Sequence, residues 1–259
     1  ASKNRLRAAI RDIEDRVIEW TAQNLGDEKM SQGRKIRIKQ AIKIRENLKK
    51  IFDGYYKEAA AVTDEYKDSA KEIKRYLEDV DIPPEFSDVD KDMIFALQQI
   101  AYNEFESLGQ NFQKEIGKIL YTGILTEQPF REMTASVRNA LSGQEDKAGR
   151  PMAAYAEQIA HDEFMKFNRA FETQKAQDLE IEYYRYMPGK GSLIADSRDF
   201  CIHRAGKVFT LDEINSWETL DWAGKNPNLP VLVAAGGYRC RHHFQPISKG
   251  MAEKLGKEV

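Results

Sequence analysis

Between Arg34 and Val80 the sequence contains no proline, and its apolar residues recur every three or four positions. This spacing places them along one side of an α-helix, and a straight helix of this length would measure roughly 70 Å at 1.5 Å per residue. Such a helix cannot bury its apolar side alone, so we expect it to pack against an antiparallel helix or another chain. Gly54 is a candidate break that would divide the stretch into two helices. The apolar positions are Ile44, Leu48, Ile51, Tyr55, Ala59, Val62, Tyr66, Ile73, Leu77 and Val80.

Other segments carry the same helical spacing. Ser2 is a suitable N-cap for a helix that ends near residue 25, and Pro129 predicts the start of a short helix that runs to Leu141. The string "LEIEYYRYM", residues 179–187, alternates and is rich in residues that favour strands, so it predicts a β-strand. Two further long helices are expected at residues 90–125 and 152–178, and the consecutive prolines at 83 and 84 end the long stretch.

These elements predict an α+β chain, with a mainly α-helical N-terminal body of long helices and a small C-terminal α+β module. We expect residues 1–150 to form an elongated helical body or arm and residues 151–259 to form the C-terminal module, in which a linking helix at 152–178 precedes a small α+β part at 179–248. A content of 41% hydrophobic and 32% charged residues is typical of a soluble, folded chain. The net charge of −2 gives no overall attraction to nucleic acid, and no apolar run approaches the length of a membrane span, so no membrane contact is expected.

Charge is unevenly distributed along the long proline-free stretch. Residues 34–50 are strongly basic, with Glu46 as their single acid, and residues 78–92 are strongly acidic, with Lys91 as their single base. Cations at the start of a helix and anions at its end oppose the helix dipole, at about 0.3–1 kcal/mol each, so helix stability does not explain the arrangement. Two interpretations stay open: solvated or internally paired faces, and a surface that binds DNA phosphates or an acidic partner. The basic residues are Arg34, Lys35, Arg37, Lys39, Lys43, Arg45, Lys49 and Lys50.

The only two cysteines lie in two short strings that also contain histidines. Cys201 and His203 are separated by one residue, as are Cys240 and His242. In extended segments each pair would share one face, and thiolate and imidazole ligands suit a tetrahedral zinc ion. Structural zinc sites usually place two to four residues between ligands, so the pattern is compatible with zinc without requiring it.

Three alternatives to a metal site are open. The cysteines can be buried, reduced side chains that pack two segments together, or they can form a disulfide. The third alternative is catalysis, in a nuclease or toxin-like domain, with a histidine as general base. The sequence contains no nucleophile elbow, P-loop or H-E-x-x-H motif, so we do not expect an enzyme. The residues that catalysis would use are His203, His242 or His243 beside Arg198 and Asp199, with Glu163 as a second acid–base group.

A resemblance to a known family covers residues from about Leu108 to Ser248. The strings that carry it are "LGQNFQKEIGKIL", "AAYAEQIAHDEFMKFNRA", "YYRYM", "DSRDFC" with "GKVFTLDEI", "WETLDWAGKNPNLP" and "GGYRCRHHFQPIS". In this order they resemble the phage Mu protein F-like family of minor head, or head morphogenesis, proteins. The chain departs from the family's pattern at His161-Asp162, where relatives often have Arg-Thr, and at Asp199, where many have Thr.

The resemblance implies a structural function in the head of a tailed bacteriophage. Such proteins are present in few copies, associate with the portal protein and other head proteins, and act in head assembly, DNA packaging or DNA delivery. The resemblance therefore implies a location inside the virion head near the portal, and in the host cytoplasm during assembly, with packaged double-stranded DNA as a further contact. It also implies metal binding at Cys201, Cys240 and His242. It does not cover residues 1–107, where the basic cluster leaves open a non-specific DNA-binding function.

Overall fold

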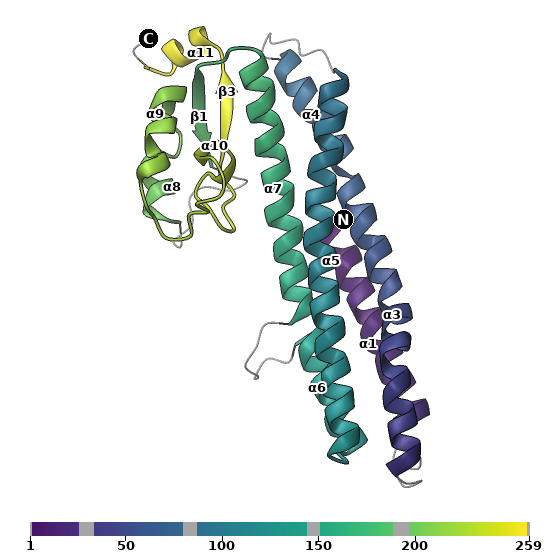
Figure 1. Ribbon diagram of the computed structural model, residues 1–259. Helices are drawn as coiled ribbons and strands as arrows, with labels where there is room; N and C mark the ends of the chain where they lie inside the picture. Colours follow the sequence, from purple (N-terminus) through teal and green to yellow (C-terminus); the bar gives the residue numbers. More distant parts are fainter. Residues whose placement is uncertain (1, 26–33, 80–86, 144–150, 189–196, 258–259) are drawn as a thin grey trace. The chain divides into compact units, whose positions relative to one another are not determined.

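The computed structural model describes residues 2–25, 34–79, 87–143, 151–188 and 197–257, without the side chains of residues 2, 34–38, 40 and 41. It confirms the predicted fold class: long helices come first, and a small three-stranded antiparallel sheet lies near the C-terminus (Figure 1). No helix among the described residues has the sustained apolar length of a membrane span. The long helices are α1 (Ser2–Leu25), α3 (Arg34–Asp64), α4 (Tyr66–Asp79), α5 (Asp88–Leu125), α6 (Phe130–Leu141) and α7 (Met152–Asp178).

The chain forms two compact units, which are described separately. The helical unit comprises Ala1–Asp64 and Gln99–Ala160, and the mixed unit comprises Glu65–Gln98 and His161–Val259. Each unit therefore takes residues from two separated stretches of chain, whereas the sequence analysis expected a division at one position, residue 150. Helices α5 and α7 contribute residues to both units.

The apolar side of α3 is buried inside the helical unit. Its apolar residues form one core with those of α1 and of the C-terminal part of α5. The packing partners expected for the long proline-free stretch are therefore other helices of the same unit. The Tyr55 hydroxyl donates a hydrogen bond to the Phe105 carbonyl at 3.1 Å. A side chain at Gly109 would lie 2.6 Å from the Tyr56 ring, so glycine permits the close contact between α5 and α3.

The break in the proline-free stretch lies at Glu65 and not at Gly54. Helix α3 continues through Gly54, where an added Cβ would make only an ordinary contact, 3.8 Å from Asp12. The helix ends after the β-branched Val62 and Thr63, which have low helix propensity, and the Thr63 hydroxyl bonds the Ala60 carbonyl at 2.9 Å.

In the mixed unit, a short sheet and several short helices follow α7. The strands are β1 (Tyr183–Met187), β2 (Val208–Thr210) and β3 (His243–Ile247), in the antiparallel order β2-β1-β3. The short helices are α8 (Asp199–Arg204), α9 (Leu211–Ser216), the 3₁₀ turn η1 (Trp217–Thr219), α10 (Val231–Ala234) and α11 (Lys249–Lys254). Tyr184 and Tyr186 of β1 point into a core that also contains Phe200, Cys201 and Cys240.

The predicted strand at 179–187 begins four residues later than expected. Glu180 has a positive φ of 52°, and the Ile181 N–H donates to the Ala176 carbonyl at 2.9 Å. A residue with positive φ followed by such a hydrogen bond is a common helix C-terminus. Residues 179–182 therefore end α7 instead of extending β1.

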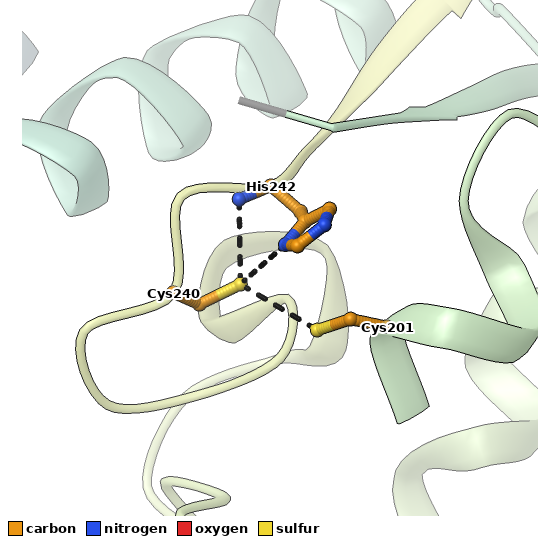
Figure 2. A group of neighbouring side chains, drawn as sticks. All are labelled: Cys201, Cys240 and His242. Carbon is orange, nitrogen blue, oxygen red and sulfur yellow. Dashed lines mark hydrogen bonds between the residues drawn. The ribbon is translucent and has the colours of Figure 1, made fainter. Parts of the chain in front are cut away.

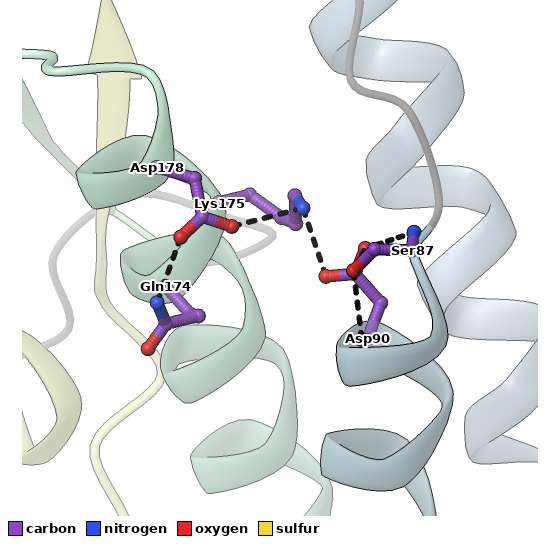
Figure 3. Close-up of polar contacts among 5 residues, drawn as sticks. All are labelled: Ser87, Asp90, Gln174, Lys175 and Asp178. Atoms are coloured by element: carbon purple, nitrogen blue, oxygen red, sulfur yellow. Dashed lines mark hydrogen bonds and ion pairs between the residues drawn. The ribbon is translucent and has the colours of Figure 1, made fainter.

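A buried ion pair joins α7 to the start of α5 within the mixed unit (Figure 3). Lys175 Nζ lies 2.8 Å from Asp90 Oδ1 and 3.0 Å from Asp178 Oδ2, and the Lys175 and Asp90 side chains are only 6% and 2% exposed. The Ser87 N–H donates to Asp90 at 2.7 Å and the Asp90 N–H donates to the Ser87 hydroxyl at 3.2 Å, which is a reciprocal helix cap. The prediction that the acidic residues oppose the helix dipole is wrong for Asp88 and Asp90. Both lie in the first turn of α5, where negative charge is favourable.

Candidate metal centre

Cys201, Cys240 and His242 lie together in the core of the mixed unit (Figure 2). Cys201 is on α8, and the other two residues are in the segment between α10 and β3, which we call the cysteine loop, residues 235–242. The two sulfurs are 3.9 Å apart, Cys240 Sγ is 3.5 Å from His242 Nδ1, and the three donor atoms all lie within 4.8 Å of one another. All three side chains are buried. The structure thus confirms that the two cysteine-containing strings are adjacent in space.

These distances fit a tetrahedral zinc ion. With Zn–S of about 2.3 Å and Zn–N of about 2.0 Å, tetrahedral geometry places two sulfurs about 3.8 Å apart and a sulfur about 3.5 Å from a nitrogen. The His242 backbone N–H also donates to Cys240 Sγ at 3.4 Å, which helps to stabilise a thiolate. Both cysteines are free thiols, so the structure contains no disulfide between Cys201 and Cys240. The cluster can hold a metal ion.

The cysteine loop is a tight turn with an unusual backbone. Ala235, Gly237 and Arg239 all have positive φ angles, of 49°, 89° and 57°. An added Cβ at Gly236 would lie 2.3 Å from Cys201 Sγ and 2.9 Å from Cys240 Sγ, so only glycine leaves room for both sulfurs. Gly236 therefore brings the backbone against the donor atoms, while an added Cβ at Gly237 would lie 1.9 Å from the Gly224 carbonyl oxygen.

Arg169 of α7 holds the cysteine loop in place. Its side chain is buried, with 4% exposure, and its guanidinium donates to four backbone carbonyls at 2.5–3.3 Å. One buried cation thus fixes both ends of the segment that positions two of the three donors. The carbonyls belong to Val233, Ala234, Cys240 and His242.

The two thiols share a proton. The pKa of Cys240 is lowered by the hydrogen bond from Cys201, by those from His242 and by the positive charge of Arg169, against the opposing effect of burial. The pKa of Cys201 is raised by its hydrogen bond to Cys240 and by burial. These hydrogen bonds favour ionisation of Cys240 over that of Cys201, and a metal ion that bound both sulfurs would release the proton of Cys201.

His203 does not join the cluster, although the sequence analysis placed it in a four-ligand set. Cys201 and His203 lie on helix α8 and not in an extended segment, so alternate residues point in different directions. His203 is exposed, and its Nδ1 lies 2.8 Å from the carbonyl oxygen of Asp199 in its own helix.

The other residues considered for catalysis lie in separate surroundings. Arg198 donates to the Tyr238 carbonyl at 2.6 Å, and Glu163 pairs with Lys166 at 2.5 Å. His243 of β3 is half-buried, and burial, with Arg169 and His242 nearby, lowers its pKa to about 4. His203 is exposed, whereas His242 is buried against Cys240.

The basic cluster of the sequence lies on α3 of the helical unit. Lys39, Lys43, Arg45, Lys49 and Lys50 are exposed, and the side chains of Arg34, Lys35 and Arg37 lie outside the described residues. Arg45 and Lys49, together with Lys114 and Lys118 of α5, line a groove of about 990 Å³. The described part of the cluster thus lies beside cations of a second helix, in a groove that Asp53 and Glu106 also line.

Sequence reasoning did not find Arg169, Tyr186 or Gly236. Arginine is common in helices of so charged a chain, and its burial is a consequence of tertiary packing. The double glycine of "GGYRC" was the one available signal, because adjacent glycines indicate a close approach of the backbone.

Fold and site together define a class: a mainly helical chain with a small α+β module that contains a buried Cys₂His donor set. Comparisons with protein-family models, with curated proteins and with solved structures found no match to the chain.

Proposed function

We propose that Cys201, Cys240 and His242 hold a structural zinc ion in a minor head protein of a tailed bacteriophage. The arrangement of the three donor atoms carries the zinc part of this proposal, because the distances from Cys240 Sγ to Cys201 Sγ and to His242 Nδ1 match tetrahedral spacing and all three atoms lie within 4.8 Å of one another. The set consists of soft and intermediate donors, which favours zinc over calcium or magnesium.

A structural function for the zinc follows from the surroundings of the donors. The three side chains lie in the core of the mixed unit, among aromatic rings of β1, α8 and β3. The ion would join α8 to the cysteine loop, two segments that are otherwise connected through a long stretch of short elements. A metal ion that binds only the folded arrangement adds its binding free energy to folding.

Elemental analysis of the purified full chain tests the zinc centre. We expect one zinc ion per chain in the wild type and in His203→Ala, since His203 is exposed and outside the cluster. Cys240→Ser is expected to lose the zinc, and a chelator is expected to remove it from the wild type as the unit loses its folded tryptophan fluorescence. A wild-type chain free of zinc, or a zinc content that His203→Ala lowers as much as Cys240→Ser does, would contradict the proposal.

The head-protein part of the proposal is supported by the resemblance of residues 108–248 to the Mu F-like proteins. Two strings of that resemblance, "DSRDFC" and "GGYRCRHHFQPIS", supply the donor atoms of a single core. The portal protein and other head proteins are the partners that this proposal implies, inside the virion head. Contact of the basic residues of α3 with packaged DNA stays a prediction.

Quantitative immunoblotting of purified phage particles tests the head-protein function. Phage particles that encode this chain are expected to contain it in few copies compared with the major capsid protein. The chain is expected to stay with the heads after tails are removed, and to copurify with the portal protein from disrupted heads. Absence of the chain from DNA-filled particles would contradict the proposal.

A further inference from the structure

We propose that the hydroxyl oxygen of Tyr186 is the fourth ligand of the metal centre, which makes the donor set Cys₂HisTyr. This inference rests on the proposed zinc centre and adds a residue that neither the cysteine nor the histidine pattern contains. Tyr186 lies in the middle of the sheet, on β1, and its side chain is fully buried.

The distances from the hydroxyl oxygen to both sulfurs fit a fourth ligand of a tetrahedral ion. Tyr186 Oη lies 3.3 Å from Cys201 Sγ and 3.8 Å from Cys240 Sγ. With Zn–S of about 2.3 Å and Zn–O of about 2.0 Å, a tetrahedral zinc ion places oxygen and sulfur about 3.5 Å apart. Both observed distances lie within about 0.3 Å of that value, and the 3.9 Å between the sulfurs lies within about 0.3 Å of the roughly 3.8 Å expected for two sulfurs.

Packing fixes the hydroxyl in this place. The Tyr186 ring stacks parallel to the His242 ring at 5.3 Å between centroids, and it contacts Phe200 and Phe244 at 6.0 and 4.7 Å. The missing Cβ of Gly236 would lie within 3.5 Å of Tyr186 Oη and closer still to both sulfurs. One glycine thus leaves space for three donor atoms at the same spot.

A phenolate ligand is compatible with the charges around the site. Two thiolates and one phenolate around Zn²⁺ give a net charge of −1, which the buried Arg169 beside Cys240 offsets. On binding, the O–H bond of Tyr186 breaks, its proton passes to water, and the oxygen binds the metal. The fourth position is then filled by the protein, which is the arrangement of structural sites and not of catalytic ones.

Metal titration of the full chain tests the proposal, with Tyr184→Phe as the matched control. Tyr184 is also a buried tyrosine of β1, but its hydroxyl has no hydrogen-bond partner among the described residues. Zn²⁺ added to the metal-free wild type and to Tyr184→Phe should produce the near-ultraviolet absorption of one ionised tyrosine. Tyr186→Phe should lack this absorption and bind zinc at least about tenfold more weakly. The visible spectrum of bound Co²⁺ should change in Tyr186→Phe alone.

The outcomes separate this inference from the zinc centre itself. Zinc binding by the wild type without ionised-tyrosine absorption would overturn the inference and leave the zinc centre intact, with Tyr186 then donating to the Cys201 sulfur. No stoichiometric zinc in the wild type would overturn both. The wild-type spectrum decides the matter even if Tyr186→Phe does not fold.

Discussion

Arg169→Met is expected to lower the free energy of unfolding of the mixed unit by about 3 kcal/mol or more, because each buried carbonyl left without a donor costs about 1–3 kcal/mol. Four carbonyls lose the Arg169 donor, although that of Ala234 keeps a hydrogen bond from the Gly237 N–H at 2.8 Å, and three of the four belong to residues that are themselves buried. Methionine fills most of the volume of the arginine side chain. The loss of stability therefore measures the effect of removing the hydrogen bonds and the positive charge. Zinc affinity should fall as well, since Arg169 holds both Cys240 and His242 in position.

Denaturant unfolding followed by tryptophan fluorescence measures this effect. In a Trp20→Phe background the remaining tryptophans are Trp217 and Trp222, both packed against the core of the mixed unit, so the signal reports that unit. The matched control is Arg185→Met on β1, which removes one exposed hydrogen bond to the Gly206 carbonyl and should cost less than about 1 kcal/mol. Equal losses in the two variants would show that the cysteine loop does not depend on Arg169.

The long helices could be predicted from the sequence because their stability depends on repeated local patterns. The bounds expected for the helix at 152–178 are those of α7, and the helix opened by Pro129 ends at Leu141 as expected. The break at Glu65 was missed because it depends on weak propensities of several residues, whereas Gly54 was a single conspicuous candidate. A glycine within a long packed helix costs only about 1 kcal/mol, which packing easily offsets.

Three of the four metal ligands predicted from the sequence lie together in the structure, and the fourth, His203, does not. Cysteine and histidine are rare in this chain, so their two strings were visible, but the geometry around Cys201 was not. Helix α8 has only six residues, too few for a periodic pattern, and its helical form turned His203 away from the site. Tyr186 and Arg169 contribute through tertiary position, which no local pattern shows.

The second large effect is expected from Lys175→Met, which should destabilise the mixed unit by about 3–5 kcal/mol at neutral pH, because it leaves Asp90 as a buried charge without its cation. Burial acts to raise the pKa of Asp90, but hydrogen bonds from Lys175 and Ser87 outweigh it and hold this pKa below its ordinary value of 3.8. Burial acts to lower the pKa of Lys175, but Asp90 and Asp178 raise it above 10.5.

These two shifts define the pH range in which the pair contributes to stability. Because the pKa of Asp90 is lowered on folding, its contribution is present above pH 3.8 and is lost as the pH falls through the lower, folded value. Because the pKa of Lys175 is raised, its contribution is present below pH 10.5 and is lost as the pH rises through the higher, folded value. In Lys175→Met the burial of Asp90 is no longer opposed by its cation, so the difference between wild type and variant should be largest near neutral pH and shrink as the pH falls towards 3.8 or rises above 10.5.

Burial is what makes this pair strong, and the chain offers a control that isolates it. Lys91 lies 2.8 Å from Asp88, the same distance as in the buried pair, but its side chain is 69% exposed and that of Asp88 is 93% exposed. Lys91→Met should therefore cost no more than about 1 kcal/mol. The double variant Lys175→Met/Asp90→Asn keeps a cap for α5 and removes the unpaired charge, so it should recover part of the stability that Lys175→Met loses. Two results would contradict the buried ion pair. One is an equal loss of stability in Lys91→Met and Lys175→Met. The other is a double variant in which the losses of Lys175→Met and Asp90→Asn simply add, because additivity means that the two side chains are not coupled.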